Sequence, residues 1–223
     1  MVVFGDFGNP GAGGGEGAAT VVQQVRAYWE SLRIDGRLPL RQHIDPRGLS
    51  SALEQVFLIE QIAPGHGRFR LAGNLFHDLM GMDVRGMPLT SLFEPVSRER
   101  VKVGLQGVFD DAAALHLGIE AERSIGQPAL SGRMALLPLR GGEGEPMLAL
   151  GVLACRGQVG RAPRRFSIGT IRTEILFPTQ TATHILRRRI PETPAPAVHP
   201  AQPPQRGAVL RLVHSRQDEP TGR

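Results

Sequence analysis

The stretch VFLIEQIAPGHGRFRLAG, residues 56–73, contains the pattern from which the fold follows. Its first seven residues are rich in β-branched and aromatic side chains, which are typical of strands. Pro64, Gly65 and Gly67 then interrupt the run, and the following RFRLAG, residues 68–73, is again extended in pattern. This order predicts two antiparallel strands joined by a tight connection.

Helical and then extended patterns follow toward the C-terminus. We expect a short helix that Asn74 caps, an irregular segment over residues 86–93, and a longer helix that Ser97 caps and that continues to residue 112. Apolar alternation and apolar runs then predict three strands, at residues 115–121, 130–140 and 147–155. This order predicts an α+β fold, with an antiparallel sheet and helices grouped in the middle of the chain.

An amphipathic helix is predicted before the sheet. Thr20 and Gln23 have capping-box spacing, and an apolar stripe follows them. Residues 56–59 and 147–155 are apolar on both sides of their strands, so the outer face of the sheet needs a cover. We expect the helix to supply it, either on its own sheet or as a homodimer contact with the helix of a second copy. The stripe consists of Val22, Val25, Trp29 and Leu32.

Composition divides the 223 residues into three parts. Residues 1–19 are a Gly-rich leader that we expect to be disordered, residues 20–156 are the domain, with its core at 55–156, and residues 157–223 are an Arg/Pro-rich, largely disordered extension. Residues 1–155 hold 14 basic and 17 acidic side chains, whereas the remainder holds 12 arginines and 4 acids. Nucleic-acid binding is therefore not expected of the domain, and only a role as a nucleic-acid accessory through the Arg-rich tail stays open.

Residue types exclude several classes of protein. The single cysteine, Cys155, excludes a disulfide framework and fits the reducing cytoplasm. No apolar run approaches the ~18 residues of a membrane span. The seven histidines lie at least 11 residues apart, so no metal site is expected. The sequence has no G-x-S-x-G motif and no local Ser, His and acid cluster, so we expect no enzymatic activity.

Several segments together resemble a bacterial PAS subfamily in which one PAS domain makes up most of a small protein. The resemblance covers residues 22–156. It implies a five-stranded antiparallel sheet around helices, with a pocket between the sheet and the long helix. It also implies a sensory or regulatory role, and because the chain has no room for an output domain we expect protein–protein contacts with a separate signalling partner. The segments are LPLRQHIDP (38–46), VFLIE (56–60), FRLAG (69–73), Gly81 and Arg85-Gly86.

The alternative that the resemblance offers is a small-ligand sensor with an apolar pocket. Haem-binding PAS domains carry His on the long helix, where residues 97–112 have none. Flavin-adduct PAS domains carry Cys on a central helix, whereas Cys155 is on the last strand. We therefore expect neither haem nor flavin, and the bulk of the lining side chains allows them to fill the pocket themselves. The predicted lining is Phe57, Phe69, Leu105, Leu117 and Met134, with Asn74 near the mouth.

Overall fold

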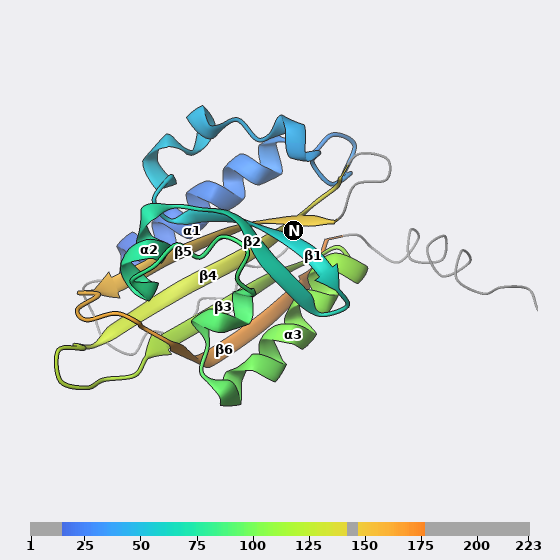
Figure 1. The fold of residues 1–223 in the computed structure, drawn as a ribbon. Helices are drawn as coiled ribbons and strands as arrows, with labels where there is room; N and C mark the ends of the chain where they lie inside the picture. Colours follow the sequence, from blue (N-terminus) through green and yellow to red (C-terminus); the bar gives the residue numbers. More distant parts are fainter. Residues whose placement is uncertain (1–14, 142–146, 177–223) are drawn as a thin grey trace, which may run out of the picture.

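The computed structural model describes residues 15–141 and 147–176 (Figure 1). Six strands form one antiparallel sheet in the order β2-β1-β5-β4-β3-β6. The predicted α+β class and the antiparallel sheet are confirmed, with one more strand than expected. The strands are β1 (Val56–Ala63), β2 (His66–Ala72), β3 (Ala113–Ala121), β4 (Leu130–Leu139), β5 (Leu148–Gly157) and β6 (Phe166–Ile175).

Helices lie on both faces of this sheet. The long helices α1 (Gly15–Ser31) and α3 (Pro95–Asp110) pack on opposite faces, which we name the outer face and the inner face respectively (Figure 1). The N-terminal amphipathic helix is therefore present, as predicted. The shorter helices are α2 (Asn74–Met80) and the 3₁₀ segments η1 (Arg41–His43), η2 (Pro46–Ala52) and η3 (Leu89–Leu92).

The inner face holds the larger apolar core. Alternate residues of β1 and β3, such as Phe57 and Leu117, belong to one buried cluster with Leu105 and the rest of the buried face of α3. Gly104 lets the helix approach closely, because a Cβ at this position would overlap the side chain of Leu115. The space between the sheet and α3 is therefore packed with side chains of the chain itself.

The outer face holds a second core beneath α1. Val25 and Trp29 are almost completely buried there against β4 and β5, and the indole Nε1 of Trp29 donates a hydrogen bond to Pro138 O at 3.0 Å. Val22 is half-buried beside them, and Leu32 follows the end of the helix. Of the two arrangements that the sequence allows, α1 thus takes the one in which it covers its own sheet.

The sixth strand corrects both the five-stranded expectation and the domain boundary at residue 156. β6 pairs with β3, with a register shift between Gly118 and Ile119. Because one extra residue of β6 is accommodated there, Phe166 and Ile168 share a side of the sheet with Ile171. The predicted boundary at residue 156 followed the shift in composition, and the irregularity hides the period-two pattern of the strand that lies beyond it.

The predicted helix caps are also corrected. α1 begins at Gly15, so Thr20 lies inside the helix, and the part of the leader from residue 15 onward is helical. Gly73 rather than Asn74 occupies the N-cap position of α2, and Glu94 rather than Ser97 that of α3. Residues 1–14 and the extension beyond Leu176 lie outside the described residues, so their predicted disorder stays a prediction.

Candidate functional site

The predicted pocket residues meet in the inner core, with one exception. Phe57, Phe69, Leu105, Leu117 and Met134 are each at most 2% exposed and belong to one cluster. Asn74 is instead exposed at the start of α2. The structure thus brings the five apolar residues together without placing Asn74 among them.

Three phenylalanine rings of this cluster contact one another, those of Phe57 on β1, Phe69 on β2 and Phe76 on α2. The ring centroid of Phe76 lies 4.8 Å from that of Phe57 and 5.6 Å from that of Phe69, and the Phe57 and Phe69 centroids are 5.4 Å apart. All are distances of favourable tilted or edge-to-face contact. Phe57 also lies over Gly151 of β5, where any Cβ would overlap its ring. The rings of Phe57, Phe69 and Phe76 therefore occupy this part of the inner core.

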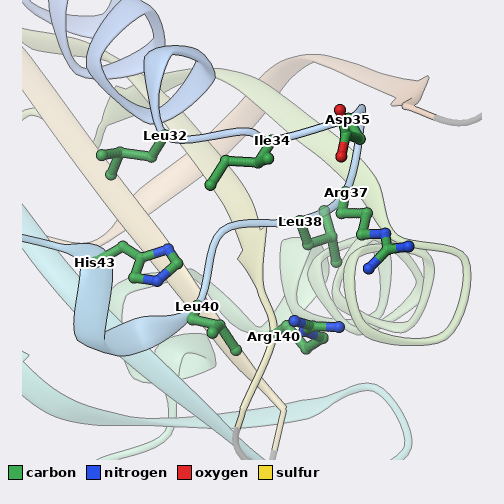
Figure 2. A pocket seen from close by; sticks show the side chains of 8 residues that line it. All are labelled: Leu32, Ile34, Asp35, Arg37, Leu38, Leu40, His43 and Arg140. Atoms are coloured by element: carbon green, nitrogen blue, oxygen red, sulfur yellow. The ribbon is translucent and has the colours of Figure 1, made fainter.

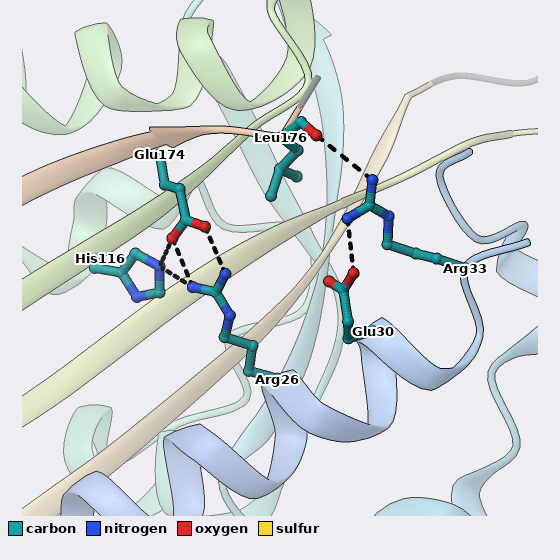
Figure 3. A network of polar contacts seen from close by, with 6 residues as sticks. All are labelled: Arg26, Glu30, Arg33, His116, Glu174 and Leu176. Atoms are coloured by element: carbon teal, nitrogen blue, oxygen red, sulfur yellow. Dashed lines mark hydrogen bonds and ion pairs between the residues drawn. The ribbon is translucent and has the colours of Figure 1, made fainter. Parts of the chain in front are cut away.

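A polar network joins α1 to the outer face at β3 and β6 (Figure 3). Arg26 on α1 makes two hydrogen bonds to the Glu174 carboxylate, from Nη1 to Oε2 at 2.7 Å and from Nη2 to Oε1 at 2.6 Å. Arg26 Nη1 also lies 3.1 Å from His116 Nε2. A bidentate arginine–carboxylate pair fixes both direction and distance, so the network holds α1 in one position on the sheet.

A second set of polar contacts lies at the end of α1, between Glu30 in its last turn and Arg33 just after the helix. Arg33 Nη1 donates to Glu30 Oε1 at 2.8 Å, and Arg33 Nη2 donates to Leu176 O at 3.5 Å (Figure 3). The Arg33 guanidinium also lies 5.4 Å from the centre of the Trp29 ring. Arg26 thus ties the middle of α1 to Glu174 of β6, and Arg33 ties the segment after α1 to Leu176, which follows β6.

His116 is neutral in this network. A guanidinium only donates hydrogen bonds, so His116 Nε2 must accept from Arg26 and the ring proton is on Nδ1. Burial, together with the charge of Arg26, lowers the pKa of His116, although Glu174 opposes this and Arg172 adds to it. The hydrogen bonds from Arg26 lower the pKa of Glu174. At neutral pH His116 is therefore uncharged and Glu174 is negatively charged.

We expect the fold to lose stability in acid, in part through His116. Below about pH 6.5 the unfolded chain protonates this imidazole while the folded chain does not, so stability falls as the pH falls. One proton changes the free energy of unfolding by at most about 1.4 kcal/mol per pH unit. Urea unfolding at pH 7.0 and 5.5 should show a smaller loss for His116→Asn than for the wild type.

The matched control for this measurement is His77→Asn, since His77 is exposed on α2. This variant should keep the wild-type pH dependence. An unchanged slope in His116→Asn would show that the imidazole does not titrate differently in the two states. The contribution of Glu174 is separate, because it is lost only as the pH falls below about 4.5 through its lowered pKa.

A hollow of about 160 Å³ lies beyond the end of α1 (Figure 2). The chain after α1 returns along β4 here, with Arg140 N donating to Pro39 O at 2.9 Å and Arg41 N to Arg140 O at 3.2 Å. Its wall is apolar and its rim carries charged groups, so it suits an apolar side chain with a neighbouring anion. Its lining residues are Leu32, Ile34, Asp35, Arg37, Leu38, Leu40, His43 and Arg140.

Cys155 is not activated for chemistry. It is partly buried against the inner core, and burial raises the pKa of its thiol to about 12. A thiol with this pKa remains protonated at neutral pH and is a poor nucleophile. Within residues 15–141 and 147–176, no group of three or more His, Cys, Asp or Glu side chains is arranged to hold a metal ion.

The network of Arg26, His116 and Glu174 was not predicted from the sequence. The alternation in residues 115–121 places His116 on the polar side of its strand, which was a signal for the outer face. Arg26 follows Val22 by four residues and precedes Trp29 by three, so it belongs to the same side of α1. Glu174 could not be placed without β6.

These features coincide with a known family. A family model of the PAS domain matches residues 18–154, and the chain belongs to the PAS domain family. Its role is accordingly sensory or regulatory. No curated protein matches the chain. None of the helices in the described part of the chain is long and apolar enough to cross a membrane.

Proposed function

We propose that this PAS domain protein is a non-enzymatic regulator of signalling that acts through protein–protein contacts and binds neither haem nor flavin. The observation that carries the proposal is the ring cluster of Phe57, Phe69 and Phe76, because buried side chains occupy the space that a ligand in the inner core would need. A small molecule would have to displace at least one buried ring. The inert thiol of Cys155 supports the non-enzymatic part, and its being the sole cysteine fits the cytoplasm.

The hollow at the end of α1 is the contact point that the side chains favour for a signalling partner. Ile34 is 65% exposed at its edge, and both Arg37 and Arg140 are exposed on its rim (Figure 2). Apolar anchors surrounded by arginine are typical of interface centres. The partner surface that fits is an apolar side chain next to an aspartate or glutamate.

The test begins with a photo-cross-linking amino acid at position 34 of the full chain in cells, followed by purification of the captured protein. Calorimetry then measures its affinity for the wild type, for Arg37→Glu and for Arg140→Glu. We expect each of these charge reversals to weaken binding by about tenfold or more, because the new glutamate then faces the aspartate or glutamate of the partner. The matched control, Arg123→Glu, changes an exposed arginine at the opposite end of β4 and should bind as the wild type does.

Equal affinity of Arg37→Glu, Arg140→Glu and the control would contradict the contact at the hollow. A small molecule found on the purified protein by native mass spectrometry, with no protein captured at position 34, would contradict the protein–protein mechanism and support a ligand sensor.

A further inference from the structure

β6 is one of the two edge strands of the sheet, and within the described part of the chain no further strand pairs with its side that faces away from β3. The start of α3 covers its beginning, because Glu94 N donates to Phe166 O at 3.0 Å and Arg100 Nη1 donates to Ile168 O at 3.1 Å. Further along, α3 stays beside the strand on the inner face, with Gly107 close to the Thr173 side chain. Residues 169–173 are exposed, and Ile175 is 73% exposed.

The exposed half of β6 has a sequence that is complementary to itself when reversed. Residues 171–175 are Ile-Arg-Thr-Glu-Ile, with an isoleucine at each end, opposite charges inside them and Thr173 at the centre. The isoleucines share one side of the strand with Thr173, and the two charged side chains share the other. When an antiparallel copy pairs with this segment, isoleucines therefore face isoleucines on one side of the two strands. On the other side, opposite charges face each other.

We propose that β6 pairs with β6 of a second copy of this chain, antiparallel and centred on Thr173, so that the two sheets become one. In this register Arg172 lies opposite the partner's Glu174, and Ile171 lies opposite the partner's Ile175. Each contact occurs twice, as a two-fold interface requires. Opposite charges and β-branched pairs facing each other stabilise antiparallel strands, and the backbone groups of both edges gain hydrogen bonds.

The contacts inside each protomer prepare this edge for pairing. Arg26 already holds the Glu174 carboxylate with two hydrogen bonds, so little side-chain freedom is lost when a second guanidinium approaches. A carboxylate accepts about four hydrogen bonds, so its bonds to Arg26 do not saturate it. Ile175, which is largely exposed in the single chain, becomes covered.

The opposite edge of the sheet lacks these properties. Arg68 and Arg70 of β2 are on one side of that strand, so an antiparallel copy would bring like charges together. The chain also covers the edge itself, because Phe69 N donates to Met87 O at 2.9 Å and Gly86 N donates to Phe69 O at 2.8 Å. β6 is therefore the edge of the sheet that is better suited to pair with a second copy.

Sedimentation of the full chain over a range of concentrations tests the association. We expect the wild type to dimerise and Ile175→Lys to raise the dissociation constant by more than about tenfold, because each dimer loses two buried isoleucines. The matched control is Leu71→Lys, which adds the same charge at a 52% exposed apolar position on the opposite edge. It should dimerise as the wild type does, and circular dichroism of both variants checks their folding.

Disulfide cross-linking tests the register independently, in a Cys155→Ala background. Facing residues of antiparallel strands have Cα atoms about 4.5–5.5 Å apart, which a disulfide spans. A mixture of Ile171→Cys and Ile175→Cys chains should therefore form a disulfide-linked dimer on oxidation. Neither chain alone should, because residues with the same number are then separated by four positions, about 13 Å.

A monomeric wild type at all concentrations would overturn the proposal. A dimer that Ile175→Lys leaves intact, or that fails to cross-link between positions 171 and 175, would overturn it as well and place the interface elsewhere.

Discussion

Replacing Trp29 with alanine is expected to lower the free energy of unfolding by about 3–5 kcal/mol. The Trp29 side chain is fully buried between α1 and the outer face of the sheet, and its Nε1 donates to Pro138 O at 3.0 Å. The substitution therefore leaves a cavity in the second core and a buried carbonyl without its donor. Urea unfolding followed by circular dichroism gives the value directly.

Two further variants separate the causes of this loss. Trp29→Phe keeps much of the ring and removes the donor to Pro138, so we expect an intermediate loss. Gln24→Ala changes an exposed position of the same helix and should stay within about 0.5 kcal/mol of the wild type. A loss below about 1 kcal/mol in Trp29→Ala would mean that α1 is not held on the sheet in solution.

The buried side of α1 could be predicted from the sequence for a simple physical reason. A helix of this length leaves only a narrow stripe for burial, so the spacing of Val22, Val25 and Trp29 identified the buried side. The need for a cover came from β1 and β5, whose sequences are apolar on both faces. Two independent patterns thus agreed on one contact. Neither of them says whether helix and sheet belong to one copy, which only the structure decides.

The predictions that were wrong concern residues whose hydrogen-bond partners are distant in sequence. Asn74 is a suitable cap by type, but Glu54 O accepts the hydrogen bond of Leu75 N at 3.1 Å, so the helix start is satisfied by the loop before β1. The Ser97 hydroxyl similarly accepts from Ile168 N at 3.1 Å. A local pattern identifies a residue that is able to cap a helix, and tertiary contacts decide whether it does.

The polar network of Arg26, His116 and Glu174 could not be predicted from the sequence for the same reason. Arg26 and Glu174 are 148 positions apart, and their pairing depends on β6 lying next to β3. The apolar pocket residues were easier, because buried positions on alternating strands point to one core whatever their order along the chain. What the sequence could not decide was whether the space among them is open or filled. That depends on ring orientations such as the one between Phe57 and Phe76.

Phe76→Ala is the variant that opens this space, and we expect it to lower the free energy of unfolding by about 3–5 kcal/mol. Phe76 is fully buried and contacts the rings of both Phe57 and Phe69. Phe76→Leu is the matched control, because it keeps most of the volume and should cost less than half as much. Urea unfolding of the three proteins measures the series.

The same variant tests whether the wild-type interior is closed. An apolar cavity of ring size binds benzene-like molecules, so Phe76→Ala should regain about 1.4 kcal/mol in the presence of benzene at ten times its dissociation constant. The wild type should gain nothing, because the Phe76 ring occupies the site, and freshly purified wild type should be colourless and free of bound mass. Stabilisation of the wild type by benzene, or haem or flavin absorbance at about 400–450 nm, would mean that the three rings part readily. The PAS interior would then be a ligand site rather than a packed core.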